Sequence, residues 1–102
     1  MFRQVVAFRW VEGTSPESKQ GLRDALERLR EIPELVAMTW GDDARHFDGN
    51  FDFVVVMDFA DFAAARRYVD HPLHQRYVQD HAVKMVGERV VVQHDWVPDR
   101  SC

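Results

Sequence analysis

The chain has 102 residues, of which 46% are apolar and 29% charged, and this is the size and composition of one globular domain. Its formal net charge of −4 argues against nucleic acid as a partner, because binding a phosphate backbone depends on clustered Lys and Arg. The single cysteine, Cys102, cannot form an internal disulfide, so the cytoplasm is the expected compartment.

The first predicted element is a β-strand over residues 2–10, a run rich in β-branched and aromatic side chains. Charged residues interrupt this run, so it is neither a signal-peptide core nor a membrane span, and no membrane partner is expected. A helix follows. It begins either with a capping box of Thr14 and Glu17 or at Ser15-Pro16, and it ends at Pro33.

Two further strands are predicted in the middle of the chain, from Leu35 to Trp40 and from Phe51 to Phe59, joined by a polar, turn-prone loop. In the second of these strands, alternation puts Val54 and Val56 on one face. The other face carries larger side chains, namely Phe51, Phe53, Val55, Met57 and Phe59. Both faces of this strand therefore carry apolar residues.

The last third of the chain begins with Asp61, which predicts the N-cap of a second helix. Pro72 breaks this helix because proline disfavours the helical conformation of the preceding residue. A second short helical piece is expected to continue to about His81. A fourth strand is predicted over residues 89–96, and residues 98–102 are expected to form a frayed tail.

This order of elements predicts an α+β domain with a ferredoxin-like βαββαβ fold, a four-stranded antiparallel sheet and both helices on one face. Two helices cannot cover both faces of a sheet whose strands are apolar on each side. The open face therefore needs a partner, and the simplest is a second copy of the chain. We expect a homodimer in which the two sheets pack face to face.

The densest group of chemically capable side chains lies between Tyr68 and His81, where three of the five histidines and both tyrosines fall. His74 follows Pro72 at the start of a short helix, where the helix dipole disfavours imidazolium, so a neutral His74 could act as a base. Tyr68 could direct its hydroxyl into the same cleft. His71, the residue before the proline, is the more structural of the histidines.

A metal site is the alternative for this segment, because His74 and His81 are seven residues apart with Tyr77 and Asp80 between them. That spacing matches no known zinc pattern and no cysteine accompanies it, so no metal is expected. Nucleophilic catalysis has no support, since the sequence contains neither a GxSxG motif nor a glycine-rich phosphate loop.

Six segments in order, VVAFRW, EGTSPE, WGDD, FDFVVVMDF, Tyr68-x-x-His71-Pro72-x-His74 and VVVQHDW, resemble the stress-responsive A/B-barrel (Dabb) family. The resemblance spans about residues 3–96 and implies a domain over 1–97 that pairs into a dimeric α+β barrel. One plant branch of the family comprises polyketide cyclases that close a poly-β-ketone by aldol condensation without a cofactor. The tyrosine and histidine of that branch match Tyr68 and His74, whereas its further histidines are replaced by Gln4 and Phe53.

The resemblance thus implies a cofactor-independent polyketide cyclase with His74 as base and Tyr68 as hydrogen-bond donor. A small apolar or polyketide-like ligand is the expected partner, and His71 could also contact it. An apolar pocket for it could be lined by Phe8, Trp10, Trp40, Phe51, Phe53, Met57 and Phe59. Two alternatives stay open: a non-catalytic stress-response dimer that binds an apolar ligand, and a cofactor-free monooxygenase.

Overall fold

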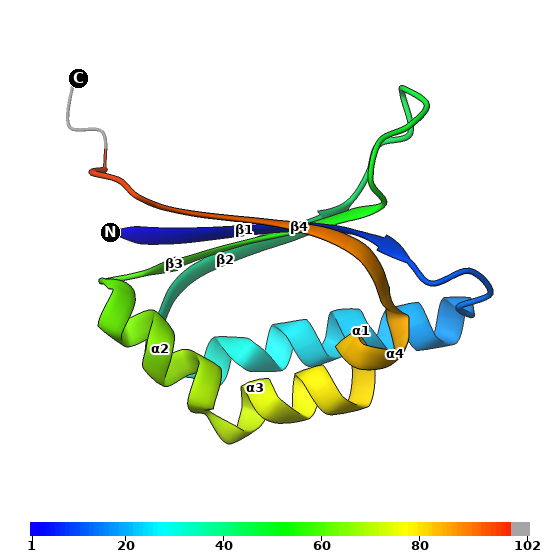
Figure 1. Ribbon diagram of the computed structural model, residues 1–102. Helices are drawn as coiled ribbons and strands as arrows, with labels where there is room; N and C mark the ends of the chain where they lie inside the picture. The colour runs from blue at the N-terminus through cyan, green and yellow to red at the C-terminus, as the bar shows by residue number, and fades with distance from the viewer. Residues whose placement is uncertain (99–102) are drawn as a thin grey trace.

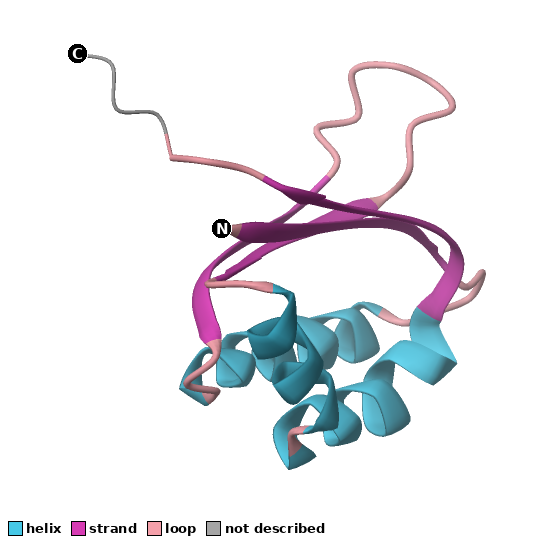
Figure 2. Cartoon of the chain, turned by 60° about the vertical axis from the view of Figure 1, so that its left-hand side comes forward, coloured by secondary structure: helices cyan, strands magenta, loops and turns pink. Residues whose placement is uncertain are grey.

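A computed structural model describes residues 1–98 and shows one four-stranded antiparallel sheet in the order β2-β3-β1-β4. The helices all lie on the same side of this sheet (Figure 1), and a second view shows the same two layers (Figure 2). The predicted ferredoxin-like α+β fold is confirmed. Of the predicted tail at 98–102, all but Pro98 lies outside the described residues.

The strand β1 (Phe2–Trp10) has the bounds that the sequence predicts, and helix α1 (Pro16–Arg28) follows it. The N-cap of α1 is Ser15, whose hydroxyl accepts a hydrogen bond from the Ser18 amide at 3.1 Å. The alternative capping box at Thr14 is wrong, because the Thr14 hydroxyl donates to the Val11 carbonyl instead, at 2.6 Å. A 3-10 turn, η1 (Leu29–Glu31), completes the helical segment before Pro33.

Strands β2 (Leu35–Asp42) and β3 (Phe53–Phe59) pair with each other, and β3 occupies the centre of the sheet beside β1. The strand β3 begins two residues later than predicted. The Asp52 carboxylate accepts a hydrogen bond from the Trp10 amide at 2.9 Å, and the Asp52 amide donates to the Phe8 carbonyl at 2.9 Å, so Asp52 is bound to the end of β1 directly before β3 begins.

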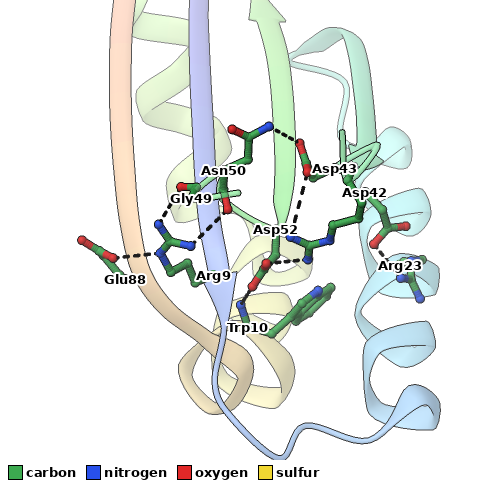
Figure 3. A network of polar contacts seen from close by, with 10 residues as sticks. Arg9, Trp10, Arg23, Asp42, Asp43, Gly49, Asn50, Asp52 and Glu88 are labelled. Carbon is green, nitrogen blue, oxygen red and sulfur yellow. Dashed lines mark hydrogen bonds and ion pairs between the residues drawn. The ribbon is translucent and has the colours of Figure 1, made fainter. Parts of the chain in front are cut away.

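The loop between β2 and β3 projects away from the helices (Figure 1) and is held by a network of ion pairs and hydrogen bonds (Figure 3). The Arg9 guanidinium donates to the carbonyl oxygens of Gly49 and Asn50 at 3.0 and 3.1 Å. The Asp52 carboxylate pairs with Arg45, which lowers the pKa of Asp52. These contacts fix the loop to the end of β1.

The second helical region consists of α2 (Phe62–Asp70), α3 (Pro72–Tyr77), a π-helical turn η2 (Val78–Ala82) and the short α4 (Val83–Met85). Asp61 caps α2 as predicted, its carboxylate accepting from the Ala64 amide at 2.8 Å. The helical segment continues four residues beyond the predicted end. The strand β4 (Val86–Asp95) begins directly after it, three residues earlier than predicted.

The core lies between the helices and the sheet, where β1 and β3 contribute every second residue, β2 contributes Met38, and β4 contributes only the partly buried Val86. The largest fully buried side chains are Tyr68, Phe8, Phe53, Phe59, Leu22, Leu26, Leu29 and Ile32. Leu22, Leu26 and Leu29 form the apolar stripe of the first helical segment and close the core from the helix side.

The other face of the sheet carries no helix (Figure 1) and is apolar at its centre. The strand register puts Val5, Val56 and Val92 in one cross-strand row of this face. Val54 and Val90 lie in the next row, flanking Ala7, and are 37% and 49% exposed. The sequence prediction of an uncovered apolar face is therefore confirmed.

Candidate active site

A cavity of about 370 Å³ lies between the helix layer and the sheet. Its walls come from β1, β3 and β4 on the sheet side and from α1, α2, α3, η2 and α4 on the helix side. The polar residues of its lining are Gln4, Tyr68, His74, Tyr77 and Arg89. The rest is apolar: Val6, Phe8, Leu26, Val55, Met57, Val78, Ala82, Val83, Val86 and Gly87.

The junction between α2 and α3 positions the predicted catalytic residues. The last carbonyl groups of a helix have no partner within it, and here His71 and His74, on either side of Pro72, supply the donors. The His71 amide donates to the Tyr68 carbonyl at 3.1 Å, and His74 Nδ1 lies 3.0 Å from the Val69 carbonyl. The His71 side chain caps α3 by accepting from the Leu73 amide at 3.1 Å. The Tyr-x-x-His-Pro-x-His segment is thus the connection between two helices.

The ring of His74 has a defined protonation pattern. A carbonyl oxygen can only accept a hydrogen bond, so Nδ1 carries the proton that it donates to Val69. In the neutral ring, Nε2 then has a free lone pair. Burial lowers the pKa of His74, while the hydrogen bond to Val69 acts in the opposite direction. The sequence expectation of a neutral His74 at the start of a helix agrees with this arrangement.

Tyr68 lies beside His74, with the two ring centroids 4.7 Å apart. Its side chain is 2% exposed, and its hydroxyl has no hydrogen-bond partner within residues 1–98. Burial, and secondarily Tyr77, raises the pKa of Tyr68, so the phenol stays protonated well above neutral pH. Burial also raises the pKa of Tyr77 to about 12, and its ring centroid lies 6.4 Å from that of His74. The structure therefore brings the predicted pair together at one cavity.

Of the polar lining residues, Gln4 and Arg89 were not predicted as site residues, and Tyr77 was named only in the alternative of a metal site. Gln4 is the one polar residue among the helix-facing positions of β1, which are otherwise Phe2, Val6, Phe8 and Trp10, and this pattern was a usable signal. Its side-chain oxygen accepts from Gln93 Nε2 at 2.7 Å, which leaves its own amide N–H groups for the cavity. The strand register places Arg89 opposite Phe8.

The predicted apolar lining is divided between two places. Phe8 and Met57 line the cavity, whereas Trp10, Trp40 and Phe53 lie outside its lining in an aromatic cluster behind Phe8. Phe53 stacks on Phe8, with ring centroids 5.1 Å apart. The other predicted lining residues, Phe51, Phe59 and His71, also lie outside the lining.

His74 and His81 do not share a site. The His81 Cε1 atom lies 3.5 Å from the position that a Cβ would take at Gly21, and His81 borders surface depressions separate from the cavity. Within residues 1–98, no group of three or more His, Cys, Asp or Glu side chains is placed to hold a metal ion. None of the helices in the same range is long and apolar enough to cross a bilayer.

Comparisons with known proteins agree with this fold. The model of the family described as "Stress responsive A/B Barrel Domain" matches residues 2–97. A dimeric ferredoxin-like protein of unknown function from Thermobifida fusca is 33% identical, with a TM-score of 0.85 over 93% of this chain and 90% of that one. A Dabb family protein from Mesorhizobium loti is 30% identical, with a TM-score of 0.76 over 94% and 96%.

A more distant structural relative is the hydroxynitrile lyase of Passiflora edulis. It is 16% identical, with a TM-score of 0.83 over 98% of this chain and 96% of that one, and the likeness shows a common fold. No curated protein shows significant similarity to the sequence.

Proposed function

The chain belongs to the stress-responsive A/B-barrel (Dabb) family, and we propose that it is a cofactor-independent enzyme that closes a ring in a polyketide-like substrate by an aldol step. His74 is the base and Tyr68 the hydrogen-bond donor. The observation that carries the proposal is the placement of His74, whose Nδ1 is engaged by Val69 while its ring lines an apolar cavity beside the Tyr68 ring.

The first step is proton removal by His74. The methylene group between two carbonyls is acidic enough for a neutral imidazole to deprotonate, and the lowered pKa of His74 keeps the ring neutral at pH 7. The C–H bond breaks, its proton passes to Nε2, and the electron pair is delocalised onto a carbonyl oxygen. The Nδ1 hydrogen bond to Val69 then stabilises the orientation of the resulting imidazolium.

The second step forms the carbon–carbon bond. The enolate carbon attacks a ketone further along the substrate, and the proton on His74 returns to the new alkoxide, so that no atom or electron is gained or lost. Tyr68 donates its hydrogen bond to the oxygen that carries charge, because its raised pKa keeps the phenol protonated throughout. A fixed donor of this kind contributes about 10²-fold or more.

The cavity suits a small apolar substrate. Its volume of about 370 Å³ falls at the lower end of ligand pockets, which span about 300–1,000 Å³. We assign Phe8 and Met57 to direct contact with the substrate, since both line the cavity. Phe53 supports Phe8 from behind, and His71 holds the helix junction through its cap on α3.

The working form is a homodimer. The valine-rich open face of the sheet leaves Val90 and Val92 49% and 53% exposed, and burying such a face yields about 25 cal/mol per Å². A second copy of the chain offers a self-complementary apolar face. The Thermobifida fusca relative is itself described as dimeric. The cytoplasm is the compartment we propose for this dimer.

The test is product analysis with a synthetic linear tri- or tetra-β-ketone thioester, comparing the enzyme with the spontaneous reaction by liquid chromatography and mass spectrometry. We expect a cyclised product with the mass of an aldol product, or of that product less water. A rate no greater than the spontaneous one would show a binding protein and contradict the proposal. A product heavier by one oxygen, with oxygen uptake at an electrode, would show a monooxygenase instead.

A further inference from the structure

The polar groups of the cavity are almost all hydrogen-bond donors. Tyr68 and Tyr77 keep protonated hydroxyls, and Gln4 has amide N–H groups left after its oxygen binds Gln93. Arg89 adds a guanidinium, and the lining formed by residues 1–98 contains no Asp or Glu. Arg89 therefore carries the one permanent charge of the lining, and it is positive in a protein whose formal net charge is −4.

Within residues 1–98, no carboxylate neutralises the charge of Arg89. None of the ion pairs among residues 1–98 involves Arg89. The adjacent carboxylate, Glu88, pairs with Arg9 at 3.1 Å instead. Arg89 is exposed while it lines the cavity, which places it at the opening rather than at the depth where Tyr68 is buried.

We propose that the substrate carries a carboxylate, which Arg89 binds at the cavity mouth. This inference rests on the proposed function and narrows its substrate class. A planar guanidinium matches a carboxylate with two parallel hydrogen bonds, and one unpaired cation balances one negative charge. With the carboxylate held at the mouth, the apolar body extends past Phe8 and Met57, and its carbonyl groups face Tyr68 and His74.

The arrangement gives Arg89 a positioning role in addition to its contribution to affinity. A substrate held at one end enters with its uncharged end first, which limits the methylene groups that can approach His74. Arg89 is thus a specificity-determining residue: it selects acidic over neutral analogues of the same shape.

Three probes of the same aromatic body test this inference, 1-naphthoate, 1-naphthamide and 1-naphthyl phosphate, titrated into the dimer and followed by NMR shifts of cavity residues. We expect wild-type protein to bind naphthoate about five- to tenfold more tightly than naphthamide at low salt, as for a partly exposed charge-assisted pair. Arg89→Gln should remove this difference, Arg89→Lys should restore part of it, and naphthamide affinity should not change.

Arg66→Gln is the matched control, because Arg66 is an exposed residue of α2 that does not line the cavity. It should leave the preference for naphthoate intact. The inference would be overturned if the wild-type protein bound naphthoate and naphthamide with equal affinity, or bound no naphthoate at millimolar concentration. It would also be overturned if Arg89→Gln and Arg66→Gln reduced the preference for naphthoate equally. Tighter binding of the phosphate by more than tenfold would also overturn it. Because these experiments measure binding, their result is independent of whether the protein catalyses cyclisation.

Discussion

The Nδ1 atom of His74 lies 3.0 Å from the carbonyl oxygen of Val69, so the ring of the candidate base closes the last turn of α2. This one hydrogen bond has both a structural and a chemical effect. It satisfies a helix-terminal carbonyl that has no partner within its own helix, and it fixes the tautomer in which Nε2 is free.

Nitrogen-15 NMR of the imidazole tests this contact directly. At pH 7 we expect His74 to be neutral with the proton on Nδ1, and its pKa should fall below the ordinary value of 6.5 because of burial. The exposed His46 provides an internal reference in the same spectra. A proton on Nε2, or a pKa above 6.5, would be incompatible with the assigned base.

Removing the hydroxyl group of each tyrosine in turn distinguishes the roles of Tyr68 and Tyr77. Tyr68→Phe should lower kcat by about 10²- to 10³-fold, because it deletes the donor nearest to His74, and should leave KM within a few-fold. Tyr77→Phe should have a smaller effect, since its ring centroid lies 6.4 Å from that of His74 instead of 4.7 Å. Steady-state kinetics on the cyclisation reaction measures both. A larger loss of kcat in Tyr77→Phe than in Tyr68→Phe would assign the hydrogen-bond donor role to Tyr77 instead of Tyr68.

The lowered pKa of His74 also predicts how stability depends on pH. Below pH 6.5 the unfolded chain binds a proton at His74 that the folded protein takes up only at lower pH, so the free energy of unfolding falls as the pH falls. It should be independent of this group above about pH 7. His74→Asn should flatten the dependence between pH 7 and 5 in urea denaturation. If the free energy of unfolding depended on pH with the same slope in variant and wild type, the pKa of His74 would not be lowered in the folded state.

The uncovered sheet face predicts a dimer that a single charge disrupts. Val92→Asp places a carboxylate in the centre of the valine rows and should yield monomers by light scattering coupled to size-exclusion chromatography. Val91→Asp is the matched control, because Val91 is 43% exposed on the same strand but faces the helix side. Dimers in both variants would exclude the open face as the interface.

Much of the fold follows from local patterns in the sequence. The β-branched and aromatic run of β1, the alternation in β3, the Ser15-Pro16 helix start and the break at Pro72 are each decided by neighbouring residues, and each prediction is confirmed. The errors occur where a distant residue intervenes. The strand β3 starts late, directly after Asp52, which is hydrogen-bonded to the backbone of Trp10 and Phe8, and β4 starts early at Val86. Gly87 conceals that early start because glycine is depleted in strands, and in the structure a Cβ at this position would lie 3.1 Å from the Arg9 carbonyl oxygen.

The site is predictable only in part for the same reason. Tyr68 and His74 lie six residues apart, so one segment can reveal them. Gln4 and Arg89 join them only through the pairing of β1 with β4 and the packing of helices on the sheet. Which aromatic residues line the cavity is the hardest part to predict. Sequence alternation places Phe8 and Trp10 on one face but does not say which of them borders a cavity.

The most direct test of the central claim compares His74→Asn with His46→Asn in the cyclisation assay at pH 7. Asparagine retains an N–H that can reach the Val69 carbonyl but has no basic nitrogen, so the fold should persist while catalysis is lost. We predict that kcat/KM falls by about 10²- to 10⁴-fold in His74→Asn and stays unchanged in His46→Asn, with both variants folded by circular dichroism. A His74→Asn variant that turns over substrate as fast as wild type would contradict the assignment.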